Sequence, residues 1–205
     1  MRDWIKPFSG QSDCHDIDVG LRALHRELAE ELAEWMPRPW RAATRWTRWL
    51  ALLPLFEHLA RGLDMPAWTA RDHDLSGLLD EQGRFDPRRL ERHGAAGLLA
   101  PGADPGVVWL VQWSQLWPPC RRDYLRTLQS LRELLAAHLE TFRRARPEDA
   151  WGLRRSLRER LRLRFHQQLL QPASPFVYLA LTALDLERLR AELTTRALFA
   201  TLEAA

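Results

Sequence analysis

The sequence predicts an all-α protein, an irregular bundle of six or seven helices with a Gly/Pro-rich insertion in its middle. Apolar residues recur at spacings of three and four over most of the chain, which is the period of a helix with one buried face. Alternation of apolar and polar residues, the mark of a β-strand, is scarce. We therefore expect a single helical domain over residues 1–205, with residues 64–105 as a less regular insertion.

The first two helices are expected to form a hairpin. The first runs from about Asp18 to Met36, and Asp16 or Asp18 can cap its start. The second begins near Pro39 and is expected to kink or break at Pro54, because proline removes a backbone donor and clashes with the preceding turn. The outward face of the first helix carries an acidic stripe: Glu27, Glu30, Glu31 and Glu34.

The insertion and the C-terminal half follow from turn and cap signals. Glycines and prolines separate short apolar pieces in residues 64–105, and Asp86 followed by Pro87 is typical of an N-cap with proline at the first helical position. Asp104 and Pro105 predict another start of the same kind. Long helices are expected over about residues 121–146, 148–171 and from Ser174 to the C-terminal region.

Composition limits the class of protein only loosely. Lys plus Arg is 30 against 27 for Asp plus Glu, a net charge of +3, and Lys6 is the only lysine. A GC-rich genome produces such an arginine bias, so it does not by itself indicate nucleic-acid binding. Cys14 and Cys120 lie too far apart for a disulfide framework or a cysteine zinc site. No apolar run approaches the roughly 18 residues of a membrane span, and the N-terminus lacks a secretory signal, so we expect a cytoplasmic protein.

Ten tryptophans cluster with arginine at helical spacing. Both residue types are enriched at the energetic centres of protein interfaces, so we interpret part of this pattern as a surface that a partner covers. The tryptophans assigned to that surface are Trp40, Trp46, Trp49, Trp109 and Trp113. The alternative is a core in which arginine stems lie over indole faces. An aromatic cavity for a flat or cationic ligand requires that the helices pack with a gap.

A dense arginine block lies in the expected helix over residues 148–171. Its four arginines assigned to polyanion binding are Arg154, Arg155, Arg158 and Arg162. A basic stripe of this kind can follow a phosphate backbone or an anionic membrane surface. The alternative is an intramolecular one, in which the arginines pair with the acidic stripe of the first helix, Glu27 to Glu34, or are simply solvated.

Catalytic motifs are absent from the sequence. It contains no Gly-x-Ser-x-Gly elbow, no phosphate loop and no dinucleotide fingerprint. His73 and Asp74 are weak metal-ligand candidates, since adjacent His and Asp on a helix resemble one element of the HD-type phosphohydrolases, but the same residues suit a turn or a cap. We predict no cofactor.

The sequence thus favours a non-enzymatic interaction protein, an adaptor or accessory subunit that docks through an exposed Trp/Arg/Leu surface onto another protein or onto a second copy. A polyanion binder that uses the Arg154 to Arg164 helix, with nucleic acid or an anionic membrane surface as its partner, is the alternative. A metal-dependent phosphohydrolase at His73 and Asp74 comes third.

Overall fold

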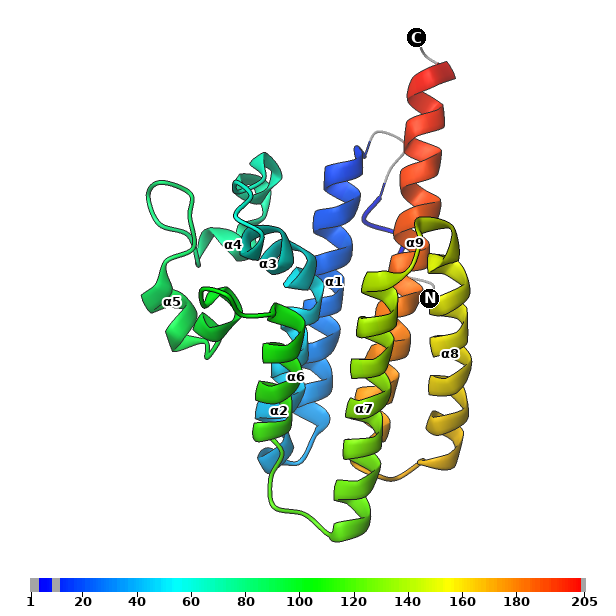
Figure 1. The fold of residues 1–205 in the computed structure, drawn as a ribbon. Coiled ribbons are helices and arrows are strands. Elements are labelled where there is room, and N and C mark those ends of the chain that lie inside the picture. The colour runs from blue at the N-terminus through cyan, green and yellow to red at the C-terminus, as the bar shows by residue number, and fades with distance from the viewer. Residues whose placement is uncertain (1–3, 9–11, 204–205) are drawn as a thin grey trace. The chain divides into compact units, whose positions relative to one another are not determined.

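The computed structural model confirms an irregular all-α bundle (Figure 1). It describes residues 4–8 and 12–203, without the side chains of Asp74 and of residues 200–203. The helices of eight residues or more are α1 (Cys14–Trp35), α3 (Leu53–Ala60), α6 (Pro105–Gln115), α7 (Arg122–Arg144), α8 (Ala150–Gln167) and α9 (Ser174–Glu203). Shorter ones are α2 (Arg41–Trp46), α4 (His73–Ser76) and α5 (Pro87–Arg92). Of the described helices, none combines the length and the apolar composition needed to span a membrane.

The chain divides into two compact units, which we describe separately. Unit 1 comprises Met1–Arg26, Trp49–Trp109 and Arg188–Ala205, and unit 2 comprises Glu27–Arg48 and Leu110–Glu187. The expected single domain over residues 1–205 stays a prediction. The less regular insertion lies in unit 1.

A reciprocal cap starts α1 earlier than the sequence predicted. The Asp13 carboxylate accepts hydrogen bonds from the backbone amides of His15 and Asp16, both at 2.8 Å, and the Asp16 carboxylate accepts one from the Asp13 amide at 3.2 Å. This is a capping box, in which the N-cap and the third helical residue satisfy each other's amides. The hydrogen bond from the Asp16 amide is the main cause that lowers the pKa of Asp13. The N-cap is therefore Asp13, and neither Asp16 nor Asp18.

The segment expected to form the second helix is interrupted, as the presence of Pro54 predicted. The chain leaves the α-helical conformation after α2, passes through a 3-10 segment, Thr47–Leu52, and resumes in α3. Pro54 lies in the first turn of α3, where its missing amide needs no partner. The interruption thus precedes the proline, because proline is tolerated in the first turn of a helix and excluded from its interior.

The insertion consists of short elements around apolar anchors. Two 3-10 segments, Ala67–Arg71 and Ala96–Leu99, flank α4 and α5, and a single isolated β-bridge joins Leu79 to Phe85. The predicted N-cap is confirmed, since the Asp86 side chain accepts from the amides of the first turn of α5. Phe85 packs on Phe56 of α3, with ring centroids 5.4 Å apart. The buried apolar residues of this region include Leu75, Leu78, Leu90 and Leu98.

Unit 2 is built around α7, α8 and residues 174–187 of α9, which run side by side (Figure 1). Their apolar faces supply buried residues at helical spacing: Leu128, Leu131 and Leu134 on α7, Leu157 and Leu161 on α8, and Phe176, Val177 and Leu179 on α9. The turns 35–40, 116–121 and 168–173 all lie at one end of this unit, the lower end in Figure 1. We call this end the turn end.

Candidate functional site

The five tryptophans predicted to form an exposed docking surface are buried: Trp40, Trp46, Trp49, Trp109 and Trp113. In unit 2, Trp40 and Trp113 pack on Phe176, with ring centroids 6.2 and 5.1 Å away. In unit 1, Trp49 lies 6.1 Å from Phe56. The prediction that these indoles are exposed is wrong, because their large apolar area makes them the residues that fill the interior.

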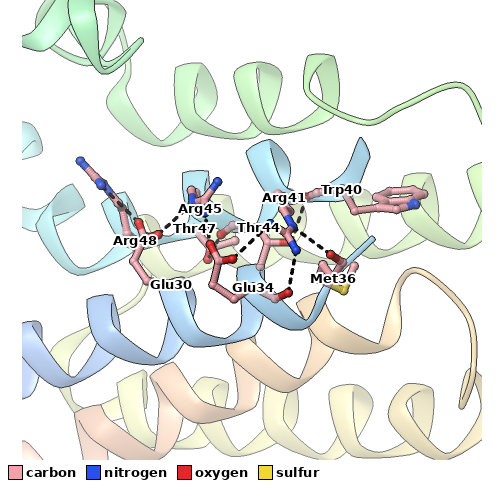
Figure 2. Close-up of polar contacts among 9 residues, drawn as sticks. All are labelled: Glu30, Glu34, Met36, Trp40, Arg41, Thr44, Arg45, Thr47 and Arg48. Atoms are coloured by element: carbon pink, nitrogen blue, oxygen red, sulfur yellow. Dashed lines mark hydrogen bonds and ion pairs between the residues drawn. The ribbon is translucent and has the colours of Figure 1, made fainter. Parts of the chain in front are cut away.

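Two carboxylates of the acidic stripe of α1, Glu30 and Glu34, pair with the arginines interleaved among those tryptophans (Figure 2). Arg45 donates to Glu30 at 2.9 Å and also contacts Glu34, while Arg48 reaches Glu30 at 3.3 Å. Arg41 donates to Glu34 at 3.1 Å. The hydrogen bond to Glu30 is the main cause that raises the pKa of Arg45. Glu30 and Glu34 therefore join α1 to α2 and to the 3-10 segment that follows α2. They do not form ion pairs with the arginine block of α8.

Two arginines of the α8 block pair with carboxylates of α9 instead. Arg158 Nη2 lies 2.6 Å from Asp185 Oδ1, and Arg154 Nη2 lies 3.1 Å from Glu187 Oε1. The Arg154 guanidinium also lies over the ring of Phe142, 4.4 Å from its centroid. Because these contacts join α8 to α7 and α9, both arginines have a structural role.

The other two assigned arginines face solvent. Arg162 has an exposed pair with Glu159 one turn away, at 3.6 Å. Arg155 is exposed and makes no ion pair within the described part of the chain. The four residues therefore do not form one uniform basic stripe.

Arg154 and Arg155 are a matched pair for separating structure from surface charge. We expect Arg154→Gln to lower the free energy of unfolding by about 1 to 2 kcal/mol, since it removes a partly buried ion pair and a cation–π contact. Arg155→Gln should change it by less than about 0.5 kcal/mol. Urea unfolding followed by circular dichroism measures both. Equal effects of the two substitutions would show that the Arg154 contacts contribute nothing.

The weak metal candidates gain no support. His73 is exposed at the first position of α4, and the side chain of Asp74 lies outside the described residues. Within the described ranges, no group of three or more His, Cys, Asp or Glu side chains is arranged to hold a metal ion.

A buried charge network in unit 1 was missed by sequence reasoning. Asp72, whose side chain is 1 % exposed, lies 3.4 Å from Arg22 Nε through Oδ2 and 3.4 Å from Arg26 Nη2 through Oδ1. Arg22 also pairs with Asp18 at 2.7 Å and lies over the Trp68 ring, 3.9 Å from its centroid. The spacing of Arg22 and Arg26, one turn apart on α1, was the available signal. Their partner lies in the insertion, where no local pattern identifies it.

His25 adjoins this network along α1. Its side chain is buried, and neither ring nitrogen has a hydrogen-bond partner. Burial is the main cause that lowers the pKa of His25 from 6.5 to about 4, and the nearby charge of Arg26 acts in the same direction. His25 is therefore neutral near neutral pH.

Large apolar side chains are exposed at the turn end of unit 2. Trp35, at the last position of α1, is 81 % exposed, and Leu170 in the turn between α8 and α9 is 99 % exposed. Leu169 beside it is also exposed, as is Arg38. The contact between Trp40 and Phe176 holds the two turns next to each other. We call Trp35, Arg38, Leu169 and Leu170 the turn-end surface.

Leu170 also has an unfavourable backbone conformation. Its φ is 68°, and it is the only non-glycine residue with positive φ in the described ranges. A left-handed conformation costs a residue with a Cβ about 1 kcal/mol or more, which is why glycine or asparagine is usual there. Hydrogen bonds on both sides hold the turn, from the Gln171 amide to the Gln168 carbonyl and from the Ser174 amide to the Gln171 carbonyl, both 3.0 Å. The chain thus presents an apolar side chain in a strained turn without burying it.

An open hollow of about 730 Å³ is lined by residues at the end of α7 and the start of α8. These helix ends lie at the opposite end of unit 2 from the turn end (Figure 1). Its charged wall is internally paired, with Arg144 2.8 Å from Glu140, and the Thr141 hydroxyl donates to the Ala137 carbonyl at 2.8 Å. Because these polar groups already bond to one another, we do not assign a ligand to the hollow.

Comparison with known proteins gives no relative from which a function can be transferred: no family model, no curated protein and no solved structure matches the chain.

Proposed function

We propose that the protein is a non-enzymatic adaptor or accessory subunit that binds another protein through the turn-end surface. The observation that carries the proposal is Leu170, an almost fully exposed apolar side chain in a left-handed backbone conformation. Two backbone hydrogen bonds hold the turn, but the Leu170 side chain gains no burial within the chain to offset the cost of its conformation. A partner that covers the Leu170 side chain would supply the favourable free energy of apolar burial that the chain itself does not provide.

The composition of the surface supports the same proposal. Trp35 and Arg38 are of the residue types most enriched among interface hot spots, and the neighbouring leucines extend the apolar area. The proposed surface contains none of the five tryptophans that were predicted from the sequence to form a docking surface. A cytoplasmic location is part of this proposal, and the free state of Cys14 and Cys120 is consistent with a reducing compartment.

Polyanion binding through α8 is a second candidate, favoured by one observation. Arg155 is exposed without an ion pair in the described structure, and the Arg162 pair is an exposed one. Its support is narrower than that for protein docking, because Arg154 and Arg158 are held by carboxylates of α9.

Site-specific photocrosslinking tests the protein-docking proposal. With p-benzoylphenylalanine at position 35, irradiation of the native host should give a discrete protein adduct. We expect the double substitution Leu169→Ser and Leu170→Gly to reduce its yield about tenfold or more, since loss of two apolar contacts at an interface centre costs at least about 1.4 kcal/mol. Glycine adopts the backbone conformation of position 170 without strain, so the fold should be retained.

The matched control places the crosslinker at Val107, an exposed apolar residue on α6 in unit 1. It should not give the same adduct. An adduct that forms equally from position 107, or one that survives the double leucine substitution, contradicts the proposal. Recovery of nucleic acid or lipid that depends on Arg155 instead of a protein adduct favours the second candidate.

A further inference from the structure

We infer that the partner of the turn-end surface is an acidic amphipathic helix of another protein. This inference rests on the proposed function and names the chemistry of the occupant. Its starting point is the charge around the exposed apolar residues.

The rim of the turn-end surface is basic. Arg38 lies in the turn after α1 and Arg122 at the first position of α7, and both side chains are exposed. The turn after α1 and the start of α7 both lie at the turn end of unit 2 (Figure 1). Neither makes an ion pair within the described residues, whereas the nearby carboxylate of Asp123 is already 3.0 Å from Arg121. Glu31 on α1, one turn before Trp35, is an exposed carboxylate that also makes no ion pair within the described residues. The unpaired charges around the surface are therefore two arginines against one glutamate, and the balance is positive.

An amphipathic helix matches this combination. Trp35, Leu169 and Leu170 offer apolar contacts on two adjacent turns, which suit a partner whose apolar residues repeat on one helical face. Carboxylates that flank this apolar face would meet the guanidinium groups of Arg38 and Arg122, whose planar geometry suits paired hydrogen bonds to carboxylate. Charge complementarity thus selects an acidic helix over a basic one.

The same charge argues against a second copy docked end to end. A two-fold dimer through this surface places each copy's Arg38 and Arg122 near the same residues of its mate. Juxtaposed like charges oppose such a contact. Asp123 is already paired with Arg121, so within the described residues Glu31 is one unpaired carboxylate against these two arginines.

Charge reversal combined with crosslinking tests the inference. With p-benzoylphenylalanine at position 35, the double substitution Arg38→Glu and Arg122→Glu should reduce the yield of the protein adduct about tenfold or more. The matched control is Arg155→Glu on α8, which should leave the yield within about twofold. Mass spectrometry of the crosslinked peptide should locate it in a segment with apolar residues at helical spacing and a net negative charge.

The outcomes separate this inference from the proposed function. An adduct that requires Leu169 and Leu170 but is unchanged by charge reversal, or that maps to a basic segment, overturns the acidic partner and leaves protein docking in place. Absence of a leucine-dependent protein adduct overturns both. Leucine-dependent co-sedimentation with vesicles of phosphatidylcholine and phosphatidylglycerol, without a protein adduct, also overturns both and assigns the surface to a membrane.

Discussion

Replacing Asp72 by asparagine is expected to lower the free energy of unfolding by about 3 to 5 kcal/mol. The aspartate side chain is 1 % exposed and forms ion pairs with both Arg22 and Arg26. Asparagine has nearly the same shape but no charge, so two largely buried guanidinium groups would lose their shared counter-ion. Removing one partner of a buried ion pair costs far more than removing an exposed one, because the remaining charge stays desolvated.

Urea unfolding followed by circular dichroism measures the Asp72 effect, with Asp64→Asn as the control. Asp64 is exposed, and its substitution should change stability by less than about 0.5 kcal/mol. In a double-mutant cycle, Arg26→Met combined with Asp72→Asn should cost less than the sum of the two single substitutions, because the pair is removed together. If Asp72→Asn stays within about 1 kcal/mol of the original chain, the network does not hold unit 1 together.

The second large effect is a loss of stability in mild acid that is caused by His25. The folded-state pKa of about 4 lies below the ordinary value of 6.5. Above pH 6.5 both the folded and the unfolded chain hold a neutral ring, so the residue has no effect on the pH dependence. Between these two values the unfolded chain takes up a proton that the folded chain refuses, and stability falls as the pH falls. The total loss by about pH 4 is about 3 kcal/mol.

The measurement compares the pH dependence of unfolding for the original chain and for His25→Phe. Phenylalanine leaves no buried polar atom, and neither ring nitrogen of His25 has a hydrogen bond to lose. We expect the difference in stability between the two proteins to grow by about 3 kcal/mol from pH 7 to pH 4 in favour of His25→Phe. Carboxylates such as Asp13 also titrate at the acid end, but they cancel in the difference.

A substitution at the exposed His73 provides a control for the effect of replacing a histidine. His73→Gln, at the start of α4, should change the free energy of unfolding at neutral pH by less than about 0.5 kcal/mol. A constant difference between the original chain and His25→Phe at all pH values would mean that His25 accepts a proton in the folded state as readily as in the unfolded one.

The local pattern of the sequence determined the helices. Apolar spacing predicted α7 to within a few residues, and Asp86 with Pro87 marked the start of α5. These features are readable because a hydrogen bond between a cap and its first turn, or a periodic apolar face, involves residues close in sequence. The N-cap of α1 at Asp13, which differs from the predicted one, also depends on local sequence, because both members of the capping box lie within four residues.

The candidate site could not be obtained in this way. Periodicity shows that a helix has an apolar face but not how completely neighbouring helices cover it, so Trp40 and Trp35 are alike in the sequence and opposite in exposure. Leu169 and Leu170 were expected inside the last turn of the helix predicted over about residues 148–171, whereas α8 ends at Gln167 and both leucines lie in the turn that follows it. Their exposure follows from a left-handed turn that a leucine rarely adopts.

The sequence by itself therefore determined the all-α class and the long helices, although the start of α1 and the end of α8 each differ from the prediction by about four residues. Only the tertiary structure decided which charges meet. Glu30 and Glu34 pair with the arginines that follow α1, while Asp72 pairs with arginines 46 and 50 residues earlier in the chain. The physical reason is range: helix formation depends on neighbours within a turn or two, whereas ion pairs and exposed surfaces depend on the placement of segments that are distant in sequence.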